Sequence, residues 1–88
     1  MPFKIEVTKE FENTYKKIAK KEKETKKAID KKVEQIIENP FRFKPLRKPL
    51  QGLRRVHIMK SFVFIYSINE NEKIITIKEY GHHDNIYK

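Results

Sequence analysis

The second half of the sequence contains three stretches with an apolar residue at every second position, separated by very short connections. The stretches span residues 54–59, 62–68 and 73–79, so the connections contain only two and four residues. Apolar side chains at every second position are the sign of a strand with one buried face, and in the middle stretch they are Phe62, Phe64, Tyr66 and Ile68. Connections this short join antiparallel neighbours. The sequence therefore predicts a three-strand antiparallel meander with one face on a core and one face open to solvent.

The first half of the sequence predicts one strand followed by two helices. Residues 3–7 alternate as a short strand, and apolar residues then recur at helical spacing within 11–19 and again within 29–37. Thr8 is a candidate N-cap of the first helix. We expect this helix to end between residues 20 and 24, and the second helix to end before Pro40. We expect one α+β domain over residues 1–88, in which an N-terminal strand precedes a helical hairpin that packs on an antiparallel sheet.

Charge is strongly segregated along the chain. Residues 39–69 contain no Asp or Glu, although the chain has twelve acidic residues and a net charge of +9. The cations of this run are Arg42, Lys44, Arg47, Lys48, Arg54, Arg55 and Lys60. A mixed Lys/Glu surface of the thermophilic kind would explain the helical half but not this run. A field of one sign favours a polyanion, and a nucleic acid is the leading candidate.

Composition excludes several classes of protein. The chain has no cysteine, so it can form neither a disulfide nor a thiol active site. No apolar run approaches the length of a membrane span, and the N-terminal residues lack the apolar core of a signal peptide. We therefore expect a cytoplasmic protein that does not bind membranes.

Arg55 and His57 are the first candidate site residues. They alternate with Val56 and Ile58, so they lie on the strand face opposite the core. A guanidinium can hold a phosphate with two hydrogen bonds, and a neutral imidazole can accept a proton. Considered alone, the pair fits an ordinary solvated sheet face better. The surrounding positive charge, Lys48 included, shifts the interpretation towards a phosphate site.

The C-terminal residues supply further titratable and aromatic groups. His82, His83 and Asp84 are metal-ligand types. Adjacent histidines of an extended chain point to opposite sides, however, and the surroundings are cationic, so we expect neither a metal nor another cofactor. One of the two histidines fits a structural role at a strand end. Tyr87 fits either a core position or a platform on which a base stacks.

Several segments together resemble the RelE/ParE toxin superfamily, in particular its RelE and YafQ mRNA-interferase branches. They are Leu50-Gln51-Gly52, Arg54-Arg55-Val56-His57, residues 61–68, Gly81-His82-His83-Asp84 and Tyr87. The resemblance implies the toxin of a type II toxin–antitoxin pair. Such a toxin cuts mRNA in the ribosomal A site, inhibits translation and is neutralised by a cognate RelB-like antitoxin.

The resemblance also implies roles for individual residues. His57 and His83 match the general base and the general acid, in either order, and His82 then keeps the structural role. Arg55 and Lys48 match groups around the reacting phosphate, and Tyr87 matches a tyrosine that stacks on or orients the nucleotide. The other basic residues predicted to contact RNA are Arg54, Lys60, Arg47 and Lys44. The chain departs from the RelE pattern at Val63, where arginine is usual, and from the YafQ pattern at Ser61, where aspartate is usual.

The implied reaction is attack of an RNA 2′-hydroxyl on the adjacent phosphorus. A base, an acid and a set of cations suffice for this step without a metal. Two alternatives remain at this point. One is a ParE-type toxin that poisons DNA gyrase without cutting nucleic acid, and the other is a basic RNA-binding module without catalysis.

Overall fold

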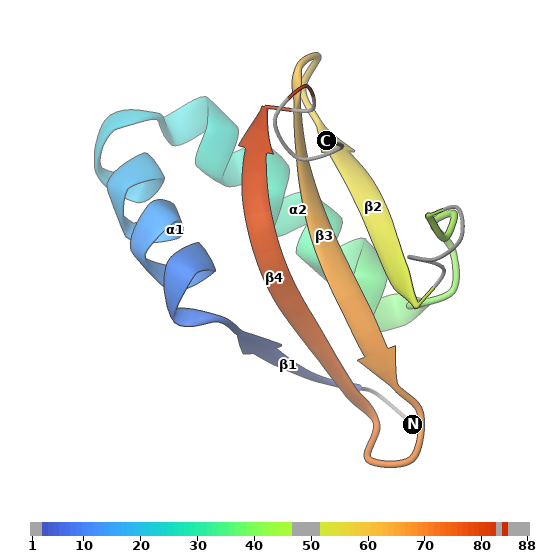
Figure 1. Cartoon of the computed structure of the whole chain (residues 1–88). Coiled ribbons are helices and arrows are strands. Elements are labelled where there is room, and N and C mark those ends of the chain that lie inside the picture. The colour runs from blue at the N-terminus through green and yellow to red at the C-terminus, as the bar shows by residue number, and fades with distance from the viewer. Residues whose placement is uncertain (1–2, 47–51, 83, 85–88) are drawn as a thin grey trace.

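The computed structural model describes residues 3–46, 52–82 and 84 of the chain. Its elements, in chain order, are β1 (Lys4–Val7), α1 (Lys9–Lys21), α2 (Lys23–Glu38), β2 (Leu53–Ile58), β3 (Phe62–Asn69) and β4 (Ile74–His82) (Figure 1). This order confirms the predicted strand, two helices and meander. The helices are separated at Glu22, within the predicted interval. Strand β4 continues three residues beyond its predicted end, so Gly81 and His82 belong to the sheet.

The four strands form one sheet in the order β1-β4-β3-β2. The pairs β2–β3 and β3–β4 are antiparallel, which confirms the meander. Strand β1 pairs with β4 in parallel, with Lys4 opposite Ile74 and Val7 opposite Ile77, so the complete sheet is mixed. The sequence alone did not assign β1 a neighbour. Its position makes β1 and β2 the two edges of the sheet.

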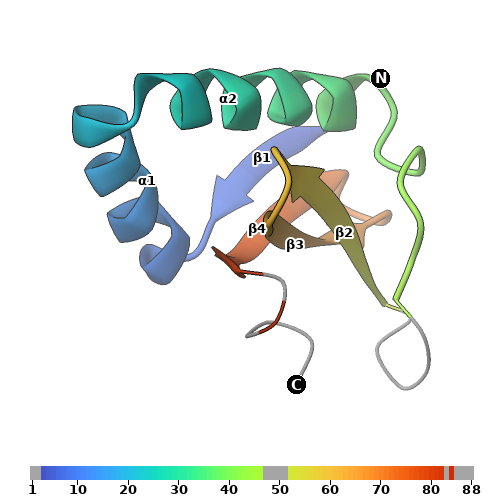
Figure 2. The same cartoon turned by 90° about the horizontal axis from the view of Figure 1, so that it is seen from above.

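Both helices cover the same face of the sheet, with α2 lying across it and α1 beside β4 (Figures 1 and 2). Apolar residues of both helices meet those of the sheet in one cluster, whose buried members are Phe11, Ile18, Ile29, Ile36, Val56, Ile58, Phe64, Tyr66, Ile75 and Ile77. Thr8 is the N-cap of α1, since its Oγ1 accepts a hydrogen bond from the Phe11 N–H at 3.2 Å. Helix α2 ends at Glu38, just before Pro40. No helix within the described residues is long and apolar enough to cross a membrane.

The face opposite the helices is not open along its whole length, so this part of the sequence prediction is wrong. Val63 and Ile65 are 0% and 4% exposed but lie outside the cluster beneath the helices. The physical reason is visible in the sequence, because residues 62–66 are an uninterrupted apolar run and so are apolar on both faces. In register, Val63 lies opposite His57 and Ile65 lies opposite Arg55. The two candidate site residues therefore flank a buried strip and not a solvated sheet.

Phe62 is a second departure from the predicted inward face. Its side chain is 39% exposed at the start of β3. It stacks on Tyr80 with ring centroids 5.5 Å apart, and His82 contacts it edge-on at 5.6 Å. Phe62 thus belongs to a small aromatic group at one end of the sheet and not to the core.

Candidate functional site

The acid-free loop, by which we mean residues 39–46 between α2 and β2, is fixed along the outer edge of β2. Pro45 forms a β-bridge with Arg54, and the N–H of Leu46 donates to the carbonyl of Leu53 at 2.9 Å. The N–H of Arg55 approaches the carbonyl of Lys44 at 3.5 Å. Figure 2 shows this segment descending from the end of α2 beside β2. The loop is therefore held to the strand that carries Arg55 and His57.

A pocket of about 260 Å³ lies where this segment, β2 and α2 meet. Its described lining consists of Lys32, Phe43, Lys44, Arg55 and His57. We call this hollow the cationic pocket. His57 and Lys44 are exposed, whereas Lys32, Phe43 and Arg55 are half-buried. None of the lining residues that the structure describes is acidic. Three permanent cations, one imidazole and one aromatic ring suit a phosphate with its attached sugar or base.

The structure brings together three of the predicted site residues, Arg55, His57 and Lys44. Arg54 is not among the lining residues of this pocket, and its recorded contacts are with the loop. Its Nη1 donates to the carbonyl of Phe43 at 2.6 Å, and its guanidinium lies 5.3 Å from the ring centre of Phe41. Lys60 is exposed in the turn after β2 and does not line the cationic pocket. Arg47, Lys48, His83 and Tyr87 lie outside the described residues.

Two residues of the cationic pocket were missed at the level of sequence, namely Lys32 and Phe43. The Lys32 ammonium lies 5.7 Å from the ring centre of Phe43, and the Arg42 guanidinium lies 5.9 Å from it. Lys32 belongs to α2, which is distant in sequence from β2. A weak signal existed for Lys32, because no acid stands three or four residues from it along the helix.

His82 takes part in local structure. Its Nδ1 accepts a hydrogen bond from the N–H of Asp84 at 3.2 Å, and its ring contacts Phe62. The Asp84 carboxylate lies 3.6 Å from the same nitrogen. Among the described residues, no three His, Asp or Glu side chains are grouped as metal ligands. These contacts support the structural role proposed for His82.

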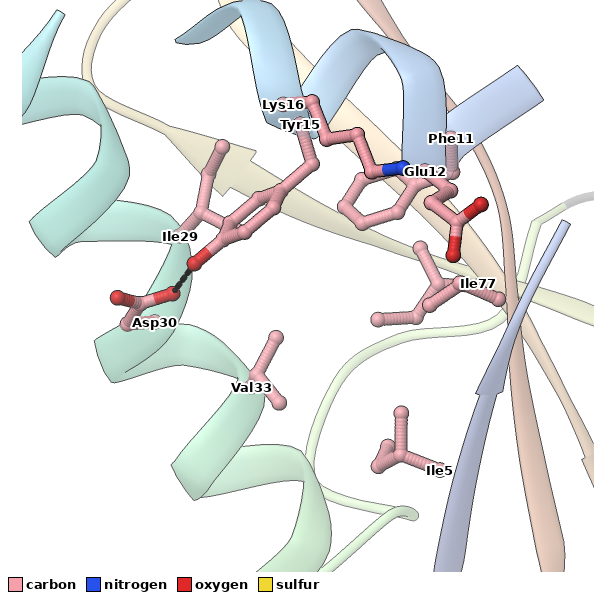
Figure 3. A pocket seen from close by; sticks show the side chains of 10 residues that line it. Ile5, Phe11, Glu12, Tyr15, Lys16, Ile29, Asp30, Val33 and Ile77 are labelled. Carbon is pink, nitrogen blue, oxygen red and sulfur yellow. Dashed lines mark hydrogen bonds between the residues drawn. The ribbon is translucent and has the colours of Figure 1, made fainter. Parts of the chain in front are cut away.

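A second hollow, of about 440 Å³, lies between α1, α2, β1 and β4 (Figure 3). We call it the apolar pocket, and its apolar lining is Ile5, Val7, Phe11, Ile29, Val33 and Ile77. At its rim, Tyr15 of α1 donates a hydrogen bond to Asp30 of α2 at 2.6 Å. Lined mainly by hydrocarbon, this pocket suits an apolar side chain and not a phosphate.

Comparisons with known proteins agree with this architecture. A family model described as the ParE toxin of the type II toxin–antitoxin system, parDE, matches residues 5–87. A Methanocaldococcus jannaschii protein named as a candidate toxin RelE4 is 43% identical over 86 residues, which cover 98% of this chain and 92% of the relative.

Solved structures share the fold at lower sequence identity. A YoeB/ParE toxin from Agrobacterium tumefaciens superposes with a TM-score of 0.82 at 15% identity, over 92% of this chain and 99% of the other. YafQ in the DinJ–YafQ complex from E. coli gives a TM-score of 0.75 at 20% identity, over 98% of this chain and 99% of the other. The strand, two helices and sheet described above are therefore a shared architecture.

Proposed function

This chain belongs to the ParE toxin family of type II toxin–antitoxin systems, and we propose that its toxic activity is ribosome-dependent cleavage of mRNA without a metal. The observation that carries the proposal is the cationic pocket, where His57 stands beside Arg55 and Lys44 and no described acid lines the space. An imidazole next to permanent cations is what phosphodiester cleavage by proton transfer requires.

In the proposed reaction, the ribose 2′-oxygen attacks phosphorus as a base removes its proton. The bond from phosphorus to the 5′-oxygen breaks, and an acid protonates that oxygen. The products are a 2′,3′-cyclic phosphate and a free 5′-hydroxyl. His57 serves as one of the two proton-transfer groups, and Arg55 stabilises the charge on the phosphorane. DNA lacks the attacking hydroxyl, so the substrate is RNA.

The remaining roles rest on the resemblance in sequence. His83 is assigned as the second proton-transfer group, Lys48 as a further cation at the phosphate and Tyr87 as the residue that orients the nucleotide. Assembly of the complete site on the ribosome likewise rests on the resemblance. We propose a cytoplasmic location for the same reason.

We also propose a cognate acidic antitoxin of the RelB-like kind. The charge of +9 would steer an acidic partner into fast, salt-sensitive association. The apolar pocket and the neighbouring edge strand β1 offer such a protein apolar burial and free backbone groups. A relative of this fold has been solved as the DinJ–YafQ complex.

The test is mapping of mRNA 5′ ends by primer extension in a translating extract, with and without the protein. We expect new ends that persist in excess chelator while the ribosomes remain intact. Replacing either His57 or His83 by alanine should lower single-turnover cleavage by roughly 10²-fold or more, with little change in ribosome binding. His82→Ala is the matched control and should at most lower stability. Equal behaviour of the His82 and His83 variants would contradict the assignment.

A second candidate function is favoured by the description of the matching family, which is that of ParE toxins. A ParE-type toxin would poison DNA gyrase without cutting RNA. In that case expression of the chain would arrest DNA replication before translation, and His57→Ala would remain toxic. This result would contradict the nuclease assignment and support the assignment as a gyrase poison.

A further inference from the structure

Lys32 differs from Lys26, which lies on the same helix. Lys26 pairs with Asp30 one turn further along the helix, at 2.7 Å. The neighbours of Lys32 at the corresponding positions are Ala28, Ile29, Gln35 and Ile36, none of which is acidic. No ion pair of Lys32 occurs within the described part of the chain. The ammonium therefore brings to the cationic pocket a charge that its own helix does not neutralise.

The surroundings of Lys32 explain how its charge is held in place. The side chain is half-buried, and its ammonium lies 5.7 Å from the centre of the Phe43 ring. The attraction between the ammonium and the face of the aromatic ring keeps the charge at the pocket. Lys44 and Arg55 line the same pocket. The two lysine ammonium groups, those of Lys32 and Lys44, face one small space whose described lining contains no acid, so they favour an anion there.

We propose that Lys32, together with Lys44, binds a phosphate of the RNA strand next to the phosphate that Arg55 and His57 engage. Helix α2 thereby becomes part of the substrate site, and the strand passes around the β2 edge between the helix and the loop. The inference rests on the proposed function, because it takes the Arg55–His57 side of the pocket as the reacting side. The ligand is the backbone of single-stranded RNA.

A purely structural role for Lys32 is the competing explanation, since its contact with Phe43 also stabilises the fold. Lys32→Met separates the two explanations, because methionine keeps the unbranched apolar stem and removes the charge. Lys32→Arg restores the charge. Lys31→Met is the matched control one residue away on the same helix, where the side chain is exposed and does not line the cationic pocket.

The experiment measures binding of a ten-nucleotide single-stranded RNA by fluorescence anisotropy over a range of salt concentrations. One phosphate contact to a single strand contributes about 0.7 to the slope of log affinity against log salt. We expect Lys32→Met to lower the slope by about that amount and Lys32→Arg to restore it. Lys31→Met should leave the slope unchanged.

A second arm places the contact along the strand. The ten-nucleotide RNA carries a sequence that the protein cuts in the translating extract, and an uncharged methylphosphonate replaces the phosphate on one side or the other of the bond cut there. At one of these positions the methylphosphonate should lower the affinity of the wild-type protein about tenfold. Lys32→Met should bind the modified and the unmodified RNA with nearly equal affinity.

The outcomes separate this inference from the proposed function. If mRNA is cleaved but Lys32→Met keeps the parental slope, Lys32 does not bind phosphate and the nuclease assignment stands. If Lys32→Met loses slope but the wild-type protein cuts no mRNA, the RNA site stands and the nuclease assignment fails. A melting temperature that falls for Lys32→Met with an unchanged slope would show the structural role alone.

Discussion

Tyr66 links the sheet to the start of the acid-free loop. Its hydroxyl donates a hydrogen bond to the carbonyl of Pro40 at 2.7 Å, and its side chain is 0% exposed. Pro40 follows the end of α2, so this bond fixes where the chain leaves the helix and turns towards the β2 edge. A single buried residue thereby helps to position the loop that carries Lys44.

Replacing Tyr66 by phenylalanine should lower the free energy of unfolding by roughly 1–2 kcal/mol, because the Pro40 carbonyl loses its partner in a buried site. Burial raises the pKa of Tyr66 to about 12, against the lowering influence of the Arg54 charge. In the unfolded chain the hydroxyl titrates near pH 10. Between about pH 10 and 12 the folded state therefore binds more protons, and stability falls as pH rises.

Denaturant unfolding at pH 8 and at pH 11 checks this prediction for Tyr66. Tyr66→Phe should be less stable than wild type at pH 8, and the difference should shrink at pH 11. Tyr80→Phe is the control, since Tyr80 is less buried and no hydrogen bond of its hydroxyl is recorded among the described residues. An equal loss in both variants would contradict a specific contribution of the Tyr66–Pro40 bond.

The sequence predicts the position of a single side chain well where the alternation of a strand decides which face of the sheet the side chain occupies. It placed Arg55 and His57 on one face of β2, and in the structure both side chains line one pocket. It did not foresee that Arg54 would bind the carbonyl of Phe43, or that Lys32 would reach the same pocket. The first contact spans 11 residues and the second brings α2 to β2, and no local period encodes either of them.

At the scale of elements, α1 and α2 are joined by a polar contact at the rim of the apolar pocket (Figure 3). Asp30 accepts hydrogen bonds from Tyr15 at 2.6 Å and from Lys26 at 2.7 Å. Partial burial acts to raise the pKa of Asp30, but these two hydrogen bonds outweigh burial and hold it below its ordinary value. The carboxylate thus connects the first helix to the second.

Asp30→Asn should lower the free energy of unfolding at neutral pH by about 1 kcal/mol or less, since solvent screens this half-exposed group. A lowered pKa means that the stabilisation is present above about pH 4 and is lost as pH falls through the folded-state value. Asp30→Asn and wild type should therefore converge in acid. Glu34→Gln, on the exposed side of the same helix, should show no such pH dependence in urea titrations.

The elements themselves were largely predictable, because each has a clear period or a clear stop signal. Helix α1 begins after Thr8 and helix α2 ends before Pro40, as predicted. The parallel pairing of β1 with β4 was not predictable, since nothing in a four-residue strand specifies its neighbour. The burial of Val63 and Ile65 was not predicted. A period of two assigns only every second residue to a buried face, whereas residues 62–66 are apolar at every position.

At the scale of the whole molecule, the two pockets lie towards opposite edges of the sheet. The apolar pocket includes Ile5 and Val7 of β1, and the cationic pocket includes Arg55 and His57 of β2. The sheet order places β4 and β3 between these two strands. One edge thus offers apolar burial suited to a protein, and the other offers charge suited to a polyanion.

This separation predicts that antitoxin binding and RNA binding respond to different substitutions. Val7 lines the apolar pocket and is 39% exposed, so Val7→Asn should leave the fold intact. It should weaken binding of the acidic antitoxin by about tenfold, the value of roughly 1.4 kcal/mol of lost apolar burial. Cleavage of mRNA by the free toxin should not change, because Val7 is remote from the cationic pocket.

The reciprocal variant is Lys44→Ala combined with Arg55→Ala. It should abolish most cleavage. It should also lower the slope of log affinity for RNA against log salt by somewhat more than one, since two charges are removed. Antitoxin should still bind it, although more slowly, because steering depends on the total charge. Titration of each toxin variant with the proposed acidic antitoxin, read by anisotropy and by cleavage, measures both effects. If Val7→Asn bound antitoxin like the parent while the Lys44/Arg55 variant did not, the antitoxin would occupy the cationic pocket itself, and inhibition would act by direct competition with RNA.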